Sequence, residues 1–393
     1  MRGLLVSRLV FALAVLAAWP VASASAADPV LDQKLVSPNF VVHYTTVAGS
    51  PDSITAGTAQ VVAGNAERAL AAEEAQFGFD PPLAGPDGHI DIYVYAFRAA
   101  TADGIVGPRS PDADQSESYI LLPANNASDL AVIAHEMFHV LQNSVWVSAG
   151  KFLDEATAVW AQVRAFPGGY STDFDPSTPL DCVDEKVCQS AGYQSWSFFE
   201  FLAERYGPRI VREIYEQAKA LRVNRGGAPT AALAAAIAPH GGTLATAFRD
   251  FALANINGDY TLDELEDAGL AGLTDTTPLR TGVKTAKLPV RSFKVDHLAT
   301  TYVPVRAGGG KRKGACRKAR LSIDVSGPKV DGVAGYALGE VKPRPIALVS
   351  GRGRLTLGSW STCSSAELIL ALINGGTSGD GRTFRVSATL IVR

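Results

Sequence analysis

The chain has 393 residues, and its 39 acidic and 36 basic side chains nearly balance, which leaves a net charge of −3. A protein without a strong positive field does not suit binding to nucleic acid, so we expect no nucleic-acid partner. The length exceeds what one ordinary core fills, and a composition with 47% hydrophobic and 19% charged residues agrees with two folded domains of unequal size.

The first 27 residues have the layout of a cleavable secretory signal. Arg2 and Arg8 flank its start, residues 9–18 are apolar, and small residues follow up to Ala26. The apolar run is shorter than the roughly 20 residues that span a bilayer, and no later segment is long and apolar enough to do so. We therefore expect a secreted, extracellular chain without a membrane span, and a monomer.

Four cysteines in an exported chain predict two disulfide bonds, for which three connectivities exist. Pairing Cys182 with Cys188 and Cys316 with Cys363 keeps each bridge within one proposed domain. No Cys-x-x-Cys pair occurs, so we expect no structural zinc site made of cysteines.

Hydrophobic periodicity predicts a small sheet followed by a helical lobe. Strands with alternating apolar residues are expected over residues 40–45, 90–95 and 118–122. Helices are expected up to Gly78, from Leu130 with Ser128 as its N-cap, over residues 153–163 and 195–206, and in three more stretches before Asn255. This order of elements predicts an α+β domain.

Beyond about residue 283 the apolar residues recur with a period of two. The clearest runs are residues 321–325, 368–372 and 384–392, with Gly, Pro and Ser between them. This pattern predicts an all-β sandwich. The proposed division is therefore a signal peptide at 1–27, an α+β domain at 28–282 and a C-terminal β-sandwich domain at 283–393.

The segment His135-Glu136-Met137-Phe138-His139 carries the clearest chemical signal in the chain. Two histidines four residues apart on a helix point the same way, so both imidazoles can bind one metal ion. Zn²⁺ with few protein ligands keeps a water, lowers its pKa and lets a neighbouring carboxylate take the proton. His135 and His139 are the predicted ligands, and Glu136 is the predicted general base.

A third ligand has to come from downstream. Val145 stands where the metzincin pattern would require a histidine, so a carboxylate is the better candidate. Asp154 and Glu155 both lie at the start of the next predicted helix, and either could reach the metal.

At this point the sequence resembles the gluzincins, the thermolysin-like clan of zinc peptidases, and in particular secreted bacterial ones. The resemblance covers residues 134–142, 153–160 and 193–207, all within the catalytic lobe. It implies a zincin-like fold, a Zn²⁺ cofactor, a peptide or protein substrate, and Glu155 as the third ligand. Many gluzincins place an aspartate four residues after that glutamate, where it orients a zinc-bound histidine. Val159 stands here instead, so another residue, for example Asp154, must orient the histidine.

The resemblance also implies a tyrosine or histidine that stabilises the oxyanion, for which Tyr193 and His240 are candidates. The strand at residues 118–122 precedes the motif helix, where an edge strand could pair with an extended peptide substrate.

Two weaker patterns occur elsewhere in the chain. Lys311, Arg312, Lys313, Arg317, Lys318 and Arg320 form a basic cluster that suits either a solvated loop or contact with an anionic cell-envelope polymer. Asn255, Asn257, Asp259, Thr261, Asp263 and Glu266 fall on the ligand positions of a calcium-binding loop. Tyr260 replaces the usual glycine of that loop and Asn255 its first aspartate, so at most weak binding is expected.

The leading hypothesis is thus a secreted zinc metalloendopeptidase. The alternative is a catalytically inactive zincin-like protein that binds envelope polymers through its β-sandwich, and a third is a purely structural envelope protein.

Overall fold

The computed structural model describes the chain in segments: residues 30–97, 103–167, 177–183, 192–257, 260–262, 279–281, 286–287, 290–307, 318–328, 333–338, 344–348, 350–361 and 367–392. The chain forms two compact units, one of residues up to Ala149 with Thr157–Phe166, the other of Gly150–Ala156 with residues from Pro167 onward. The division passes through one continuous helix, α3 (Lys151–Ala165). The predicted signal peptide and the predicted domain boundary at residues 282 and 283 lie outside the described residues, so both stay predictions.

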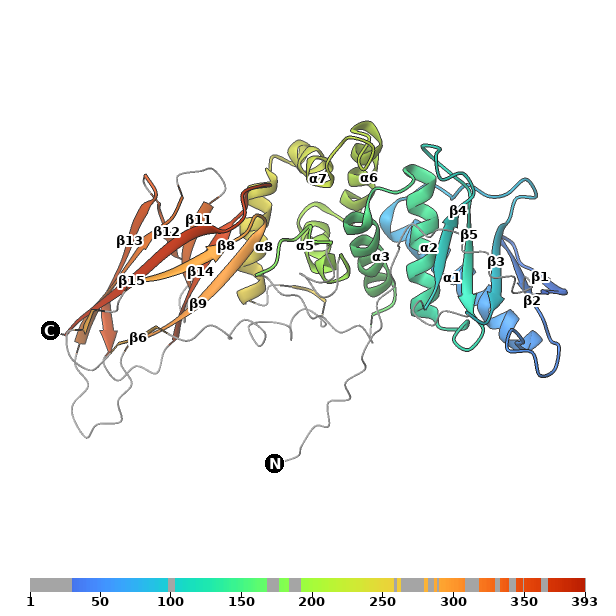
Figure 1. The fold of residues 1–393 in the computed structure, drawn as a ribbon, viewed down its shortest axis with the longest axis horizontal. Helices are drawn as coiled ribbons and strands as arrows, with labels where there is room; N and C mark the ends of the chain where they lie inside the picture. Colours follow the sequence, from blue (N-terminus) through green and yellow to red (C-terminus); the bar gives the residue numbers. More distant parts are fainter. Residues whose placement is uncertain are drawn as a thin grey trace, which may run out of the picture. The chain divides into compact units, whose positions relative to one another are not determined.

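The first unit contains a five-stranded mixed sheet (Figure 1). Its strands, in spatial order, are β1 (Gln33–Val36), β2 (Phe40–Tyr44), β3 (Ile90–Tyr95), β5 (Ser118–Pro123) and β4 (Ile105–Pro108). The three inner strands run parallel, and each edge strand is antiparallel to its neighbour. The expectation that the strand at residues 118–122 is an edge strand is wrong, because β5 is paired on both sides and β4 forms the edge.

Two helices cover the apolar face of this sheet. Ile90, Ile92 and Val94 are buried on that face, while the side chains between them are partly exposed. Helix α1 (Ala56–Phe77) begins at its N-cap Thr55 and ends at Gly78, whose left-handed backbone (φ 70°) suits a glycine. The predicted end of this helix is confirmed.

Helix α2 (Leu130–Val145) carries the histidine motif and packs against α1. Its N-cap is Asp129, whose carboxylate accepts hydrogen bonds from the amides of Ala131 (2.8 Å) and Val132 (3.4 Å). The prediction of Ser128 as the N-cap is therefore wrong by one residue, since the longer Asp side chain one position later reaches both orphan amides. The ring of Phe138 on α2 packs edge-on against Phe77 at the end of α1.

The second unit begins with the first turn of α3 and continues as a helical lobe. Its helices are the 3₁₀ helix η1 (Tyr193–Ser195), α5 (Trp196–Tyr206), α6 (Ile210–Ala220), α7 (Pro229–Ile237), the 3₁₀ helix η2 (Ala238–His240) and α8 (Leu244–Asn257). Rings of Phe198 and Phe201 from α5 pack against Phe251 from α8. Within the described residues no single helix is long and apolar enough to cross a bilayer, although α7–η2 and α8, bent by 88° at their junction, would pass together by length and composition.

Among the described residues, two five-stranded sheets form the β-rich part of the second unit. One sheet has the order β13 (Arg352–Ser361), β10 (Lys318–Ser326), β15 (Arg382–Val392) and β7 (Ala286–Lys287), with β8 (Arg291–Val295) also paired to β15. The other has the order β12 (Arg344–Ile346), β11 (Val333–Leu338), β14 (Glu367–Asn374), β9 (Ala299–Ala307) and β6 (Leu279–Thr281).

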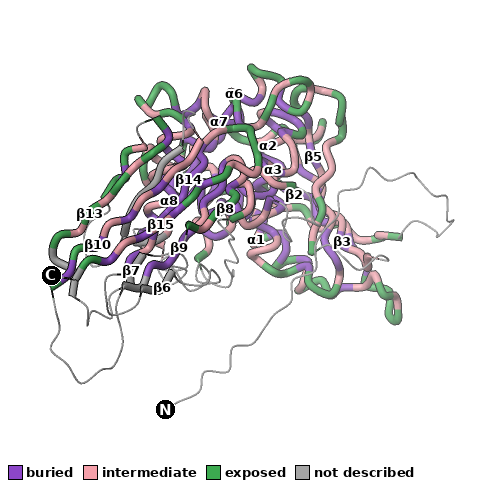
Figure 2. The backbone as a smooth tube through the Cα atoms, turned by 60° about the vertical axis from the view of Figure 1, so that its left-hand side comes forward, coloured by how far each residue is buried: buried purple, intermediate pink, exposed green. Residues whose placement is uncertain are grey.

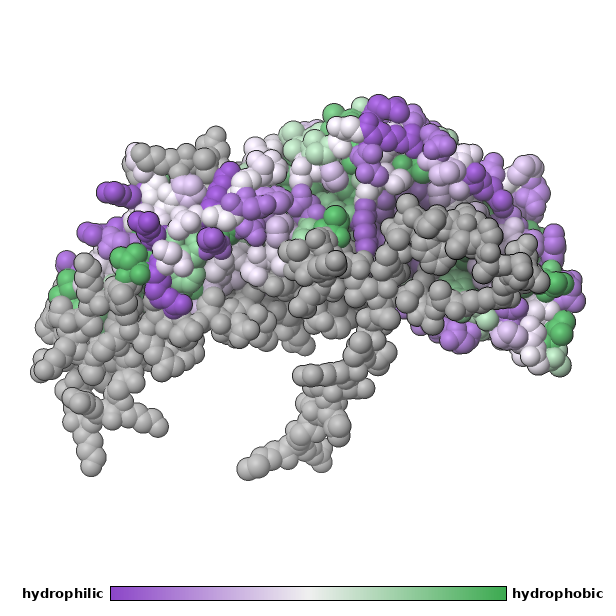
Figure 3. All heavy atoms as spheres, viewed as in Figure 1, coloured by the Kyte–Doolittle hydropathy of each residue, from purple (hydrophilic) through white to green (hydrophobic). Residues whose placement is uncertain are grey.

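The apolar residues of both sheets form one common core. Leu321 and Ile323 of β10 meet Leu370 and Leu372 of β14 in this core, and Figure 2 shows buried and more exposed residues alternating along the strands. The alternation is the period of two that the sequence showed. Figure 3 shows hydrophilic and hydrophobic residues interspersed over the described part of the face in view. The mixed α/β architecture followed by a β-rich region is confirmed.

Candidate metal centre

Helix α2 places the two motif histidines one turn apart on its partly exposed side. The Nε2 atoms of His135 and His139 lie 3.2 Å apart, with the rings nearly perpendicular at 85°. The apolar residues Met137 and Phe138 between them point into the core and are fully buried. The 3.6-residue helical period therefore separates a packing face from a face that presents two nitrogen donors.

Glu155, in the first turn of α3, completes a cluster with both histidines. One ligand atom from each of His135, His139 and Glu155 lies within 4.8 Å of the other two. Glu155 is almost fully buried, whereas both histidines are partly exposed. The structure thus brings together the three residues that the sequence nominated as metal ligands.

Asp154 takes a different part in the structure. Its Oδ2 accepts a hydrogen bond from the Gly150 amide at 3.0 Å, and its Oδ1 accepts one from the Tyr215 hydroxyl at 3.0 Å. Asp154 therefore stabilises the start of α3 and binds α6, and it is not part of the cluster with the histidines. Of the two alternatives left open by the sequence, the geometry favours Glu155.

The hydrogen bond of His139 to Gln142 defines the protonation of the imidazole ring. Gln142 Nε2 donates to Thr157 Oγ1 at 2.8 Å, which leaves its Oε1 facing His139 Nδ1 at 2.7 Å. An amide oxygen only accepts, so Nδ1 of His139 carries a hydrogen, and in the neutral ring the lone pair then lies on Nε2. This is the tautomer that a metal ligand needs, and Gln142, rather than Asp154, orients the ring of His139.

Glu136 lies in close contact with Gly104, the residue just before β4. A β-carbon added to Gly104 would stand 2.6 Å from both Cγ and Oε1 of Glu136. Glu136 itself is only 6% exposed. The start of the edge strand and the predicted general base therefore touch each other, and glycine is the residue that leaves room for this contact.

Gly192 packs on the first turn of α3 in a similar way. A β-carbon at Gly192 would lie 3.0 Å from the Lys151 carbonyl oxygen and 3.5 Å from Cβ of Glu155, and its φ of +88° also favours glycine. Tyr193, one of the two oxyanion candidates, follows directly. The other candidate, His240, binds Glu213 through Nε2 at 2.8 Å, and no described contact joins it to the cluster.

The donor set fits Zn²⁺. Zinc binds imidazole nitrogens and carboxylate oxygens, and two nitrogens about 2.0–2.1 Å from a tetrahedral ion lie about 3.3 Å apart. The observed separation of 3.2 Å between the two Nε2 atoms agrees with this value. Three protein ligands would leave one coordination position for water or substrate, as in catalytic zinc sites.

Only part of the calcium-loop pattern and part of the basic cluster lie within the described residues. Asn255 lies within α8 and accepts a hydrogen bond from the Tyr260 hydroxyl, while the Thr261 amide and hydroxyl both donate to Glu204. The remaining acidic positions of the calcium-loop pattern lie outside the described residues. Of the basic cluster, Lys318 and Arg320 are exposed on β10 and the other four members are not described.

The predicted disulfide pairings stay predictions. Of the four cysteines, only Cys182 lies within the described residues, among which no cysteine is free.

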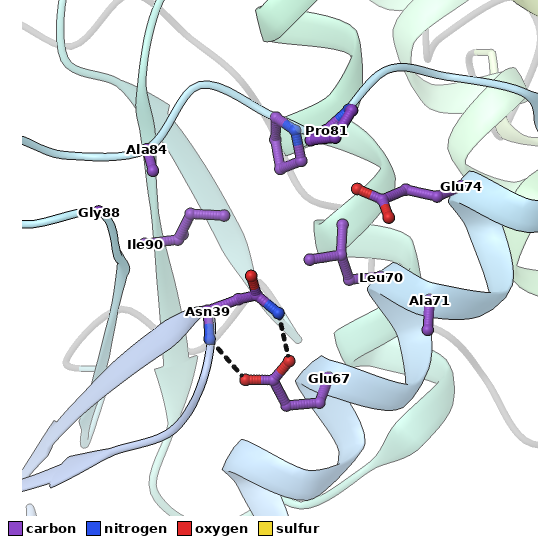
Figure 4. A pocket seen from close by; sticks show the side chains of 10 residues that line it. Asn39, Glu67, Leu70, Ala71, Glu74, Pro81, Ala84, Gly88 and Ile90 are labelled. Atoms are coloured by element: carbon purple, nitrogen blue, oxygen red, sulfur yellow. Dashed lines mark hydrogen bonds between the residues drawn. The ribbon is translucent and has the colours of Figure 1, made fainter.

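The first unit also contains a cavity of about 220 Å³, and no residue of the metal cluster lines it. Leu70 and Glu74 of α1 and Ile90 of β3 point into it, and Asn39 binds Glu67 at its border (Figure 4). None of the predicted site residues lines this cavity.

Comparison with known proteins gives one family. The family described as a family of unknown function, DUF6055, matches residues 23–297, more than half of the chain. The chain belongs to the DUF6055 family. None of the curated proteins compared matches it. The DUF6055 match includes the histidine motif, Glu155, Gly104 and Gly192, and it ends in the turn between β8 and β9.

Sequence reasoning missed three parts of this DUF6055 site. Gln142 lies on the motif helix three residues after His139, but its hydrogen bond to Thr157 depends on how α2 and α3 pack. Gly104 and Gly192 have no side chain that signals chemistry. The sequence offers only a glycine before a short Ile-Val-Gly-Pro strand and a glycine before Tyr193. Neither can be recognised as part of the site until its contact with Glu136 or Glu155 is known.

Proposed function

We propose that the mature chain is a secreted, zinc-dependent metalloendopeptidase with a zincin-like catalytic domain, similar to the gluzincins. The proposed zinc ligands are His135, His139 and Glu155, and the proposed general base is Glu136. The observation that carries the proposal is the cluster of three donors within 4.8 Å. The tautomer of His139 imposed by Gln142 supports it independently.

The proposed reaction is the hydrolysis of a peptide bond. When bound, zinc would act as a Lewis acid and lower the pKa of a water molecule at the site. Glu136 would take a proton from the attacking water and pass it to the amide nitrogen as the C–N bond breaks, so that a carboxylate and an amine leave. The contact with Gly104 would hold the Glu136 carboxylate in place during both transfers.

The edge strand β4 supports a peptide as the substrate. Within the part of the chain that the structure describes it pairs only with β5, so its other side can hydrogen-bond an extended peptide as an additional strand. Because Gly104 precedes β4 and touches Glu136, a peptide bound in this way would pass beside the general base. Strand β4 therefore takes the role of pairing with the substrate that the sequence analysis gave to the strand at residues 118–122.

Tyr193 is the better of the two proposed oxyanion donors. It follows Gly192, which packs on Glu155, whereas the Nε2 atom of His240 binds Glu213. In this proposal the Tyr193 hydroxyl would donate a hydrogen bond to the oxygen that becomes negatively charged in the transition state.

The test uses the purified chain from residue 28 to residue 393 with casein and a peptide library as substrates. Wild-type protein should cleave both, and a zinc chelator should abolish cleavage until zinc is returned. Glu136→Gln should retain zinc and lose at least about 100-fold in kcat. Glu74→Gln, a glutamate outside the cluster, serves as the matched control and should keep full activity.

Full activity of Glu136→Gln would refute the proposed mechanism. A wild-type protein that binds zinc tightly but cleaves neither substrate would favour the alternative of an inactive, zincin-like binding protein. A protein that folds and holds no zinc would refute both the ligand set and the peptidase.

A further inference from the structure

The turn between β8 and β9 binds a segment that leads to the metal centre. This segment, residues 177–183, lies between α3 and η1 in the sequence. The Leu180 amide donates to the Leu298 carbonyl oxygen at 3.0 Å, and His297 Nε2 lies 2.9 Å from Oδ1 of Asp181. Leu180 and Leu298 are both buried. The β-rich region is therefore joined to residues 177–183 by a backbone hydrogen bond and an ion pair.

His297 is held by a carboxylate on each side of its ring. Its Nδ1 lies 2.5 Å from Oδ1 of Asp380, in the turn between β14 and β15, while its Nε2 faces Asp181. Ionised carboxylates only accept hydrogen bonds, so both ring nitrogens must donate for the two contacts to exist together. Only the protonated imidazolium does this, and the neutral ring would lose one of them.

The surroundings of His297 favour the protonated form. Burial alone would lower the pKa of His297, but the hydrogen bond with Asp380 and the charge of Asp181 outweigh it, so the pKa is raised. The same contact lowers the pKa of Asp380. The neighbouring Asp296 accepts from the Gly381 amide and adds a further negative charge to the turn.

The segment 177–183 is in turn connected to the metal centre. Ser195 Oγ donates to the Leu180 carbonyl oxygen at 2.6 Å, and the Ser195 amide donates to the Gly192 carbonyl oxygen at 3.2 Å. Gly192 packs directly on the turn of α3 that holds Glu155. A continuous series of contacts thus runs from His297 through Leu180 and Ser195 to Glu155.

We propose that His297 is a positioning residue for the metal centre: it fixes residues 177–183, and through Ser195 it holds Gly192 against Glu155. The β-rich region then takes part in building the active site, rather than serving only as an attachment module. The expected effect of His297 on zinc binding rests on the proposed function. Its expected effect on the position of residues 177–183 and 192–195 does not.

The structural part is tested by hydrogen exchange on the metal-free full-length chain. In the wild type, the protection of the Leu180 and Ser195 amides, corrected for intrinsic exchange, should fall as pH rises through the raised pKa of His297. In His297→Gln the protection should be about 10- to 100-fold lower near pH 6 and no longer depend on this titration, because one charge-assisted hydrogen bond is lost. Unchanged protection in His297→Gln would overturn the proposal.

The effect on the metal centre is tested by zinc affinity at one fixed pH. His297→Gln and Asp181→Asn should each weaken zinc binding by up to about tenfold, by displacing Glu155. The control is Tyr302→Phe, which removes a hydrogen bond between β9 and α8 away from this series and should leave zinc affinity unchanged.

If His297→Gln lowers the melting temperature but leaves zinc affinity at the wild-type value, His297 is merely structural and the proposal is overturned. A wild type that binds no zinc refutes the proposed function instead, and the hydrogen-exchange result then still decides whether His297 controls residues 192–195.

Discussion

The substitution Gly104→Ala tests whether Glu136 needs its observed position. The added methyl group would stand 2.6 Å from Cγ and 2.8 Å from Cδ of Glu136, where non-bonded carbons normally lie about 3.5–4.0 Å apart. Glu136 would have to move by about 1 Å, and it has little space because it is 6% exposed. A displacement of this size at a catalytic group costs about 100-fold in rate.

The assay is kcat/KM on a peptide substrate, with zinc content and melting temperature measured on the same preparations. We expect Gly104→Ala to lose about 100-fold in kcat/KM while zinc remains bound. Gly64→Ala is the matched control, because Gly64 is an exposed glycine inside α1 with nothing within 4 Å of an added β-carbon. It should keep full activity and gain about 0.5–1 kcal/mol in stability. A Gly104→Ala variant as active as Gly64→Ala would refute the assigned role of the contact.

Three further predictions concern buried polar groups. Burial removes the Glu73 carboxylate from water and raises its pKa well above the usual value, and among the described residues neither of its oxygens has a hydrogen-bond partner. The folded chain thus holds this proton more tightly than the unfolded chain does, so this group's contribution to stability is greatest at low pH and is lost as pH rises above the unfolded pKa. Glu73→Met should therefore raise the unfolding free energy at pH 8 by about 1–3 kcal/mol, with a smaller gain near pH 4, and equal gains at both pH values would contradict this. Gln142→Leu removes the acceptor that fixes the tautomer of His139 and should weaken zinc binding about 10- to 100-fold in a chelator competition, so a change below twofold would count against it. Tyr302→Phe removes the hydrogen bond to the buried Ala252 carbonyl and should lower the unfolding free energy by about 1–2 kcal/mol in urea titration, whereas unchanged stability would show that the bond contributes little.

The sequence predicted the elements whose periodicity is strong. Strands β2, β3 and β5 and helix α2 were found because a buried face imposes a regular spacing on apolar residues. Strands β1 and β4 were missed, since each has four residues and β4 contains Gly and Pro, so neither shows a usable alternation. The missed β4 led to the wrong choice of edge strand.

In the candidate site, too, residues that share one helix could be predicted, whereas contacts between elements could not. His135, His139 and Glu136 share one helix, and their spacing alone indicated a common metal. The choice between Asp154 and Glu155 required the structure, because it depends on which carboxylate α6 and Gly150 already bind. Contacts between elements, such as those of Gly104 and His297, leave no regular pattern in one sequence.

The most direct test of the account is the zinc content of purified protein, measured by elemental mass spectrometry after dialysis against buffer with limiting free zinc. The matched variants are Glu155→Gln and Asp154→Asn, which remove one charge each from adjacent residues of α3. We predict about one zinc ion per chain in the wild type and in Asp154→Asn, and almost none in Glu155→Gln. Equal zinc in the wild type and Glu155→Gln, or loss of zinc in Asp154→Asn alone, would contradict the proposed metal centre.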